Sequence, residues 1–548
     1  MIFAAICLLC SQCQALRLSR PIIAFFARLL SVFLLVVACQ TAGAEMVWHR
    51  GALGDPGSLD PHKTTTVIEG NILAELYEGL VTFDAKGEIV PGVARSWTAN
   101  VEGDVYTFQF RPDAKWSNGD KVEPDDFVFA FRRLLNPATA AQYSNLMYFL
   151  RNAEKVNKGE LPLDSLGVRS LGETALEISL ERPVPYFIEA LAHLTALPVH
   201  RKSVEMFGNG FTKPGKLIGN GAFVLKDFTP NDCVTLVKNS YYYDAARVAL
   251  DKQIFYPIED RSAALRRFMA GEIDSYGDIP FDQIAFVQDR LGEQFRVSPY
   301  LAAYYYAFDT RHKPFDDPRV RRALAMVIDR EFLAERIWGG TMEPSYSFVP
   351  PGIRSYGLPA TVSWKDQEPF DREDEAKRLL REAGYGPGRK LEIEIRYNSS
   401  ENHKATAVAV ADMWRVLGVE TRLLNTDATS HFAYLHSKGP FDVARFAWYG
   451  DYADAQNYLF LAESENDALN IAHYANADFG ALMRKAAEER DPQRRTGLLH
   501  RAETMLLEDQ PYLVLMSYRS SNLVSRKLHG WEPNVLDHHP GRYITIGP

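Results

Sequence analysis

Strand-like and helix-like patterns alternate along almost the whole chain after residue 44, and this alternation limits the possible folds more than any other feature. Alternating apolar residues predict strands at 105–110, 233–238, 391–397 and 512–518. The same pattern predicts a hairpin of two strands over 168–180. Helical spacing is found at 125–135, 376–384, 479–490 and 494–508. Interleaved elements without repeats predict a mixed α/β or α+β protein of several lobes. At 548 residues and 46% apolar composition, the chain can bury the cores of two to four domains.

The first 44 residues have the order of a secretory signal peptide. Three arginines at positions 17, 20 and 28 precede the apolar run Leu29 to Ala38 and the small-residue site Ala42-Gly43-Ala44. This order predicts export to the periplasm, with cleavage before Glu45. A lipoprotein signal that leaves Cys39 acylated is the alternative. The apolar run is short for a membrane span, and no later stretch of the sequence approaches one.

Charge and cysteine content narrow the class of protein further. Residues 45–548 carry a net charge of −12, because the leader holds three of the 61 basic residues and none of the 70 acidic ones. Such a chain has no electrostatic reason to bind nucleic acid or an anionic membrane. Cys233 is the one cysteine after the leader, so an internal disulfide is impossible. We expect Cys233 to be an inert core thiol within its strand.

Motifs for catalysis or cofactors are missing from the sequence. It contains no Gly-x-Ser-x-Gly elbow, no His-Glu-x-x-His, and no spaced Cys/His cluster after the leader. The adjacent His538 and His539 are interpreted as solvated residues rather than metal ligands. The sequence therefore predicts no cofactor, no metal site and no enzymatic activity.

Seven segments together carry a resemblance to a known family. They are Ser58-Leu-Asp-Pro-His62, EGNILAELYEGL (69–80), PGVARSW (91–97), DAKWSNGDKVEPDDFVFAFRR (113–133), GNGAFVLKDF (219–228), DDPRVRRALAMVIDR (316–330) and FDVARFAWYGDY (441–452). From Trp48 to Pro548 the chain resembles the periplasmic oligopeptide-binding proteins, the receptors of peptide-importing ABC transporters. The block 113–133 is specific to the superfamily, and the others favour its oligopeptide branch.

The resemblance implies a two-lobed, three-domain clamshell that closes by a hinge around its ligand. Domain I would comprise residues 45–81, 200–301 and 518–548, domain II residues 82–199, and domain III residues 302–517. The implied partners are short peptides and the permease subunits of an ABC transporter, with the receptor itself a monomer.

The resemblance also implies which residues hold a peptide by its two charged ends. Asp451, just after the apolar strand that begins near Phe441, matches the family aspartate that receives the ligand ammonium. Arg445 and, for longer ligands, His403 match positions that receive the carboxylate; His403 would have to be protonated to act as a cation.

Between the ends, main-chain groups of Ala447, Trp448 and Tyr449 and of the segment from Glu69 to Asn71 are expected to pair with the peptide as added strands. Trp448 and Tyr143 would supply pocket walls. Each assignment has a structural alternative: Arg445 and Asp451 in structural ion pairs with one another or with neighbours, Glu69 as the cap of a helix over 72–77, and Trp448 as a core residue.

Departures from the family leave the identity of the ligand undetermined. Trp338 lies near the position of a lysine that some members use for longer peptides, so the preferred length is undetermined. A receptor for a murein peptide, a dipeptide, a peptide antibiotic or haem is the alternative within the superfamily. A secreted peptidase is the alternative from another class.

Overall fold

The computed structural model describes residues 45–547 except 65, 278 and 467–468. Residues 47–548 form one unit, and residues 1–46 form another. The predicted leader, residues 1–44, lies outside the described residues.

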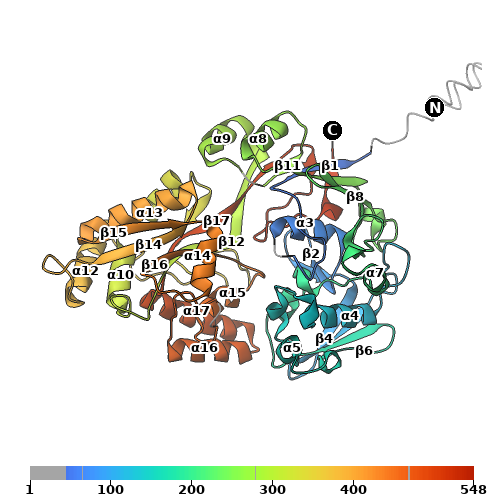
Figure 1. Cartoon of the computed structure of the whole chain (residues 1–548), viewed down its shortest axis with the longest axis horizontal. Coiled ribbons are helices and arrows are strands. Elements are labelled where there is room, and N and C mark those ends of the chain that lie inside the picture. Colours follow the sequence, from blue (N-terminus) through green and yellow to red (C-terminus); the bar gives the residue numbers. More distant parts are fainter. Residues whose placement is uncertain (1–44, 65, 278, 467–468, 548) are drawn as a thin grey trace, which may run out of the picture. The chain divides into compact units, whose positions relative to one another are not determined.

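A sheet of 11 strands runs through the unit 47–548 (Figure 1). Its order is β15-β14-β16-β12-β17-β11-β1-β10-β9-β8, with β13 paired to β17. The strands are β1 (Val47–Ala52), β8 (Phe223–Thr229), β9 (Cys233–Lys238), β10 (Lys252–Pro257), β11 (Ser275–Tyr276), β12 (Phe295–Phe308), β13 (Met342–Pro344), β14 (Glu392–Asn398), β15 (Glu420–Thr426), β16 (Val443–Tyr449) and β17 (Tyr512–Val524).

Separate cores divide the unit into two lobes. Lobe A is built around cores formed by residues 48–291 and 523–544, and lobe B around a core formed by residues 301–516. The long antiparallel strands β12 and β17 belong to both lobes. Their register shifts between Pro299 and Ala303, at the passage from one lobe to the other. Proline has no amide hydrogen for a ladder, which is compatible with an irregularity at this point.

Lobe A adds a second sheet, of order β4-β5-β7-β6, to its part of the large one. These strands are β4 (Ala94–Ala99), β5 (Val105–Phe110), β6 (Val168–Ser170) and β7 (Ala175–Ser179), beside the pairs β2 (Val81–Phe83) with β3 (Ile89–Pro91) and β18 (Leu528–His529) with β19 (Thr545–Ile546). The helices are α3 (Val67–Leu76), α4 (Pro124–Leu135), α5 (Ala153–Asn157), α6 (Phe187–Ala190), α7 (Arg201–Phe207), α8 (Arg261–Met269) and α9 (Ile284–Leu291).

Lobe B places helices around the parallel strands β15, β14 and β16, to which β12 is added antiparallel. Its helices are α10 (Pro318–Met326), α11 (Arg330–Phe332), α12 (Pro369–Glu382), α13 (Glu401–Trp414), α14 (Ala428–His436), α15 (Gln456–Leu459), α16 (Ala477–Glu488) and α17 (Pro492–Asp509). Residues 301–308 of β12 are almost fully buried, as expected for a strand covered on both faces.

Several residues of the block 113–133 anchor α4. Asp126 accepts a hydrogen bond from the Trp116 indole (2.9 Å) and closes a capping box with Glu123. Near the other end of the helix, Arg133 forms a two-pronged ion pair with Asp60 of the Ser58–His62 segment (2.9 and 2.6 Å). The two motifs therefore fasten α4 to the segment that precedes α3.

The predicted elements are all found, with shifted ends. The hairpin over 168–180 is β6 and β7, whereas the helix predicted at 376–384 already begins at Pro369, and the strand predicted at 512–518 continues to Val524. Cys233 is half-exposed and outside the cores, so its prediction as a core thiol is wrong. Among the described residues, we find no helix with both the length and the apolar character needed to cross a membrane.

Candidate functional site

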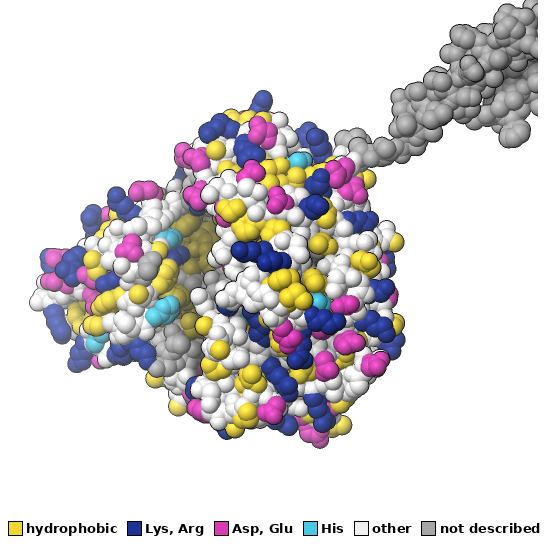
Figure 2. Space-filling view, turned by 45° about the vertical axis from the view of Figure 1, so that its right-hand side comes forward, with side chains coloured by type: hydrophobic (Ala, Val, Ile, Leu, Met, Phe, Trp, Pro, Cys, Tyr) yellow, Lys and Arg dark blue, Asp and Glu magenta, His cyan; other side chains and the backbone are white. Residues whose placement is uncertain are grey.

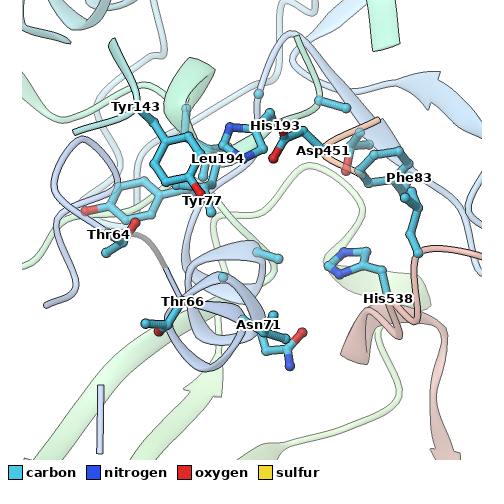
Figure 3. Close-up of a pocket in the computed structure, with 18 of the residues that line it drawn as sticks. Thr64, Thr66, Asn71, Tyr77, Phe83, Tyr143, His193, Leu194, Asp451 and His538 are labelled. Carbon is cyan, nitrogen blue, oxygen red and sulfur yellow. The ribbon is translucent and has the colours of Figure 1, made fainter. Parts of the chain in front are cut away.

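A cavity of about 380 Å³ is lined by residues of both lobes. The surface is hollowed between the lobes, and hydrophobic side chains are visible inside the hollow (Figure 2). Lobe A contributes residues from α3, from β2, from the segment after α6 and Tyr143 from the segment between α4 and α5, and lobe B contributes Tyr449, Gly450 and Asp451 at the end of β16. Figure 3 shows Tyr143, His193 and Asp451 near one another, with Asn71 on the neighbouring helix.

Asp451 is half-buried in this cavity and has no cationic partner among the described residues. Its backbone amide donates to Asn457 Oδ1 (3.0 Å). Burial raises the pKa of Asp451 to about 6, and hydrogen bonding from the Asn457 side chain opposes this rise. The carboxylate is thus ionised at pH 7 but poorly solvated, a state that favours an incoming cation.

Buried acidic side chains elsewhere in the chain have strong partners. Four of them pair with arginines: Asp60 with Arg133, Glu75 with Arg50, Glu78 with Arg542, and Asp454 with Arg495. Glu503 instead accepts hydrogen bonds from three backbone amides and the Tyr356 hydroxyl. The predicted structural alternative, an ion pair between Arg445 and Asp451, is not formed.

The walls near Asp451 are aromatic and uncharged. Tyr143 and His193 lie with ring centroids 5.8 Å apart. Burial, and then the charge of Asp451, raise the pKa of Tyr143, while burial lowers the pKa of His193 to about 4. Both rings are therefore neutral at pH 7. Tyr449, 49% exposed, lines the same cavity, and its ring centroid is 5.1 Å from that of Tyr518.

Glu69 and Asn71 are helical, so the prediction that their main chain adds a strand to the ligand is wrong. Glu69 lies in the first turn of α3 and forms a capping box with Thr66. Its carboxylate accepts from the amides of Thr66 and Ser58 (3.1 and 2.9 Å). In the helix, the main-chain groups that could pair with an added strand form helical and capping hydrogen bonds instead. Asn71 nevertheless lines the cavity with its side chain (Figure 3).

Arg445 is buried on β16, 6% exposed, outside the residues that line the cavity. Its guanidinium donates to Asn398 Oδ1 (3.2 Å) and the Tyr518 hydroxyl (3.1 Å) and lies over the Tyr304 ring. Its Nε has no hydrogen-bond partner, and no described acidic residue forms an ion pair with it. The positive charge is therefore buried beside neutral groups only.

Two other buried arginines show what a structural arginine looks like in this chain. Arg321 donates to the carbonyls of Asp509 and Gln510 at the end of α17 and to that of Phe315, which precedes α10. Arg330 donates to the carbonyls of Val514, Ala325 and Ile328. Backbone carbonyls carry partial negative charge and satisfy both side chains. Arg445 lacks such a set.

His403 lies beside Arg445 but is neutral. Its Nδ1 is 3.2 Å from the Tyr304 hydroxyl, and its ring packs against Trp338. Burial, followed by the charge of Arg445, lowers the pKa of His403 to about 3. The condition for His403 to act as a cation is thus not met at pH 7. Trp338 donates to Thr406 Oγ1 (3.0 Å) and occupies the space near His403.

Strand β16 leaves part of one edge unpaired. It pairs with β12 along its whole length, from Tyr449 opposite Ala302 to Val443 opposite Phe308. On its other side, β14 reaches only Val443 and Ala444. The main chain of Ala447, Trp448 and Tyr449 therefore has no second strand among the described residues. Trp448 packs against the core of lobe B and donates to Asn457 (3.0 Å), in agreement with its structural alternative rather than with a pocket wall.

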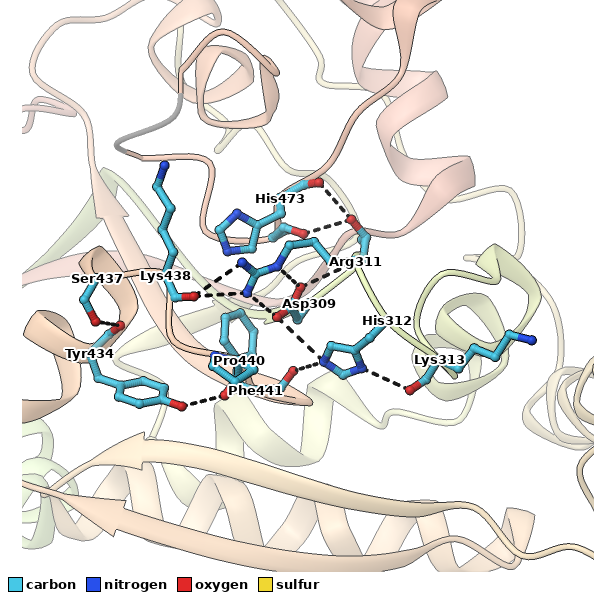
Figure 4. Close-up of polar contacts among 12 residues, drawn as sticks. Asp309, Arg311, His312, Lys313, Tyr434, Ser437, Lys438, Pro440, Phe441 and His473 are labelled. Carbon is cyan, nitrogen blue, oxygen red and sulfur yellow. Dashed lines mark hydrogen bonds and ion pairs between the residues drawn. The ribbon is translucent and has the colours of Figure 1, made fainter.

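A polar cluster at the start of β16 fixes the strand (Figure 4). Asp309, fully buried after β12, holds Arg311 through two hydrogen bonds (2.8 and 2.6 Å). Arg311 donates to the carbonyl of Lys438, and His312 Nε2 lies 2.7 Å from the carbonyl of Phe441. The loop that leads into β16 is thus tied to the end of β12.

Two residues of the site escaped the sequence analysis. His193 lines the cavity, and Asn457 contacts Asp451. His538, predicted to be solvated, also lines the cavity, and burial lowers its pKa to about 3. No local pattern marks these residues, because lobe contacts and a short helix bring them to the site.

Comparisons with known proteins agree with this architecture. The chain is 36% identical over 485 residues to the periplasmic murein peptide-binding protein MppA of Escherichia coli K12, covering 88% of this chain and 89% of the relative. It is 35% identical over 482 residues to the periplasmic oligopeptide-binding protein OppA of Salmonella typhimurium, covering 86% and 87%.

Solved structures match over nearly the same length. The unliganded open form of MppA superposes with a TM-score of 0.82 at 34% identity, over 92% of this chain and 98% of the other. Haemophilus influenzae OppA in complex with the peptide RPPGFSPFR gives a TM-score of 0.77 at 32% identity, over 92% and 99%. The model of the bacterial extracellular solute-binding proteins, family 5 (middle region), matches residues 88–470. The chain belongs to family 5 of the bacterial extracellular solute-binding proteins.

Proposed function

We propose that this protein is an extracytoplasmic receptor that captures a short peptide between lobes A and B and delivers it to an ABC importer. The observation that carries the proposal is Asp451, an unpaired carboxylate in a cavity shared by both lobes. The relatives named above are binding proteins for oligopeptides and murein peptides, which supports the same class of ligand.

The ammonium end of the peptide binds Asp451. A hydrogen bond to a charged group contributes about 1.5–3 kcal/mol, and an ammonium desolvated without a partner costs more. The neutral walls of Tyr143 and His193 leave Asp451 as the charge that attracts the ligand in this part of the cavity. A peptide with a blocked amino group is expected to be rejected.

The carboxylate end binds Arg445. The Arg445 guanidinium has a free Nε and no acidic partner among the described residues, and a carboxylate can accept two parallel hydrogen bonds from the arginine fork. Side-chain movement around Tyr449 and Tyr518 must open the path, because Arg445 is buried in this structure. Neutral His403 acts as a hydrogen-bonding neighbour of this end.

The peptide main chain pairs with the unpaired edge of β16 at Ala447–Tyr449. This pairing recognises any sequence, because each residue of a peptide presents one donor and one acceptor. Tyr449, half-exposed, closes the cavity against ligand side chains.

The domain division expected from the resemblance stays part of the proposal: domain I as 45–81, 200–301 and 518–548, domain II as 82–199, and domain III as 302–517. The separate core of residues 301–516 supports domain III as one lobe. The continuous core of 48–255 supports domains I and II as the other. We also propose a cleaved leader at residues 1–44, with Cys39 acylation as the alternative, a periplasmic location, and a monomer that docks on a permease.

Catalysis is not part of the proposal. No cluster of three or more potential metal ligands is found among the described residues. The family and the named relatives are binding proteins. A secreted peptidase would shorten a peptide library incubated with the protein, whereas a receptor returns the peptides at full length by mass spectrometry.

The test of the proposed function is calorimetric titration with trialanine and with its N-acetylated form. We expect Asp451→Asn to lower the affinity for the free peptide roughly 10- to 150-fold, as the loss of one charged hydrogen bond predicts. The acetylated peptide should bind both proteins poorly. Equal affinity of the wild type for the two peptides would contradict the role of Asp451.

A further inference from the structure

Asn457 connects the two ends of the segment that carries the proposed amine anchor. It lies on α15 and is 1% exposed. Its Oδ1 accepts one hydrogen bond from the Trp448 indole (3.0 Å), at the end of β16, and one from the backbone amide of Asp451 (3.0 Å). The turn from 448 to 451 is thus fastened at both ends to one side chain.

The hydrogen-bond capacity of Asn457 leaves one group for the carboxylate. An amide oxygen has two lone pairs, and Trp448 and Asp451 occupy both. The NH₂ group remains as a donor, and hydrogen bonding from the Asn457 side chain lowers the pKa of Asp451, as it does that of the neighbouring Tyr452, against the effect of burial. Asn457 therefore holds the backbone of Asp451 and favours its ionised side chain.

No other described neighbour provides this stabilisation. Tyr143, Tyr452 and Tyr458 interact electrostatically with Asp451, and His193, Tyr300, Tyr449 and His538 line the same cavity. Burial raises the pKa of each of these tyrosines, and it lowers the pKa of His193 to about 4 and that of His538 to about 3. All seven are neutral at pH 7, so none offsets the cost of the buried carboxylate.

We propose that Asn457 is a positioning residue, which fixes the direction and the charge of Asp451 so that a ligand ammonium is received at the end of β16. This inference rests on the proposed function of Asp451. Asn457 is not among the residues that line the cavity, so it acts through Asp451 rather than by contact with the ligand. By also holding Trp448, it sets the spacing between the unpaired edge of β16 and the carboxylate.

The test replaces Asn457 by alanine and measures two quantities. The first is the pKa of Asp451 in the ligand-free protein, from carboxyl ¹³C shifts in NMR, and the second is the affinity for trialanine between pH 6 and 8. We expect the pKa of Asp451 to rise by about one unit or more, because burial is then unopposed. For a rise of one unit, the loss of affinity at pH 6 exceeds the loss at pH 8 about fivefold.

Asn470→Ala is the matched control. Asn470 is also a buried asparagine of lobe B, and it bonds Tyr474, Tyr512 and Glu463 away from the cavity. This variant should leave the pKa of Asp451 and the affinity unchanged. If Asn457→Ala does not fold, Asn457→Ser removes the amide with a smaller change in volume, and the same shift is expected.

An unchanged pKa of Asp451 in the Asn457 variants would overturn the proposal, and so would an affinity loss that is equal at all pH values. In the Asp451→Asn background, Asn457→Ala should add little to the loss of affinity. The proposed function fails separately, if Asp451→Asn binds trialanine as the wild type does; the NMR measurement still tests Asn457 in that case.

Discussion

Asp451, the proposed amine anchor, is held in a state that is unfavourable in the ligand-free protein. Most buried acids of this chain are neutralised by arginines, whereas Asp451 faces tyrosines and a neutral histidine. Its raised pKa means that the ionised form destabilises the folded, ligand-free protein. Affinity for an ammonium is obtained at the expense of stability, a common feature of functional sites.

Removal of this charge should stabilise the ligand-free protein. A carboxyl with a folded pKa of about 6 favours folding while it is protonated, and this contribution is lost as the pH rises through 6. We expect Asp451→Asn to raise the free energy of unfolding by roughly 1–3 kcal/mol at pH 8 and to have little effect at pH 4. Urea unfolding after ligand removal measures both values.

The matched control for this prediction is Asp60→Asn. Asp60 is also buried, but it pairs with Arg133, so its replacement should destabilise the protein at pH 8. A destabilising effect of Asp451→Asn at pH 8 would show that its charge is satisfied without ligand, against the assignment of this residue.

Arg445 leads to a prediction about the other end of the ligand. We expect Arg445→Met, of similar length but without charge, to lower the affinity for trialanine at least tenfold, because the carboxylate loses a charged partner. Trialanine amide should bind wild type and variant about equally, since its carboxyl end carries no charge. Calorimetry measures all four affinities, and a variant that still prefers the free carboxylate would place that end elsewhere.

At the residue scale, the sequence predicted the anchors but not their states. Asp451 and Arg445 were found because a strand pattern and a family resemblance coincide at 441–452. The charge of His403 depends on burial beside Arg445, Tyr304 and Trp338, which are distant in sequence. No pattern in the sequence distinguishes Asn457, which lies on a short helix; only the fold places it beside Asp451.

At the element scale, β16 is the feature on which the proposed binding depends. Its start is tied to β12 through Asp309, Arg311 and His312 (Figure 4). The edge of β16 that faces away from β12 is unpaired beyond Ala444. A strand held at one end with a free edge at the other is suited to receive an added strand.

The open edge predicts sensitivity to the ligand main chain. N-methylation of the amide nitrogen of the second or the third residue of trialanine removes a donor and adds bulk at the edge. We expect at least one of the two methylated peptides to bind several-fold to tenfold more weakly, as the loss of a main-chain hydrogen bond implies. The matched ligand has the methyl group on the side chain instead, with 2-aminobutyrate in place of alanine. Full affinity of both N-methylated peptides would exclude pairing with β16.

Most elements could be predicted from periodicity, because their apolar faces are buried in one core. The exceptions are informative. The segment after Thr66 was expected to be extended, although Thr66 and Glu69 have the spacing of a capping box, and the helix forms from that box onwards. The continuation of β17 beyond Tyr518 depends on pairing with residues 295–299, which no local pattern reveals.

At the scale of the whole molecule, direct contacts join the two lobes. Tyr186 of lobe A stacks on Tyr452 of lobe B with centroids 5.0 Å apart and planes within 7°. Arg490 of lobe B donates to the carbonyls of Val101 and Glu102 of lobe A. The sequence implied two lobes through its resemblance, but it did not indicate these contacts, which join loops hundreds of residues apart.

The aromatic stack predicts an effect on ligand release. An aromatic pair contributes about 0.5–1.5 kcal/mol beyond its buried area, so Tyr186→Leu should speed peptide dissociation roughly 2- to 12-fold. Tyr385→Leu, confined to lobe B, is the control and should leave the rate unchanged. Stopped-flow displacement measures both rates. An unchanged rate for Tyr186→Leu would show that the stack does not contribute to holding the lobes together.

The most direct test is a crystal structure of the protein with trialanine bound. The account predicts the ligand's amino nitrogen about 2.7–2.9 Å from a carboxylate oxygen of Asp451 and its terminal carboxylate on the guanidinium of Arg445. A bound peptide whose amino nitrogen lies away from residue 451 would contradict the account.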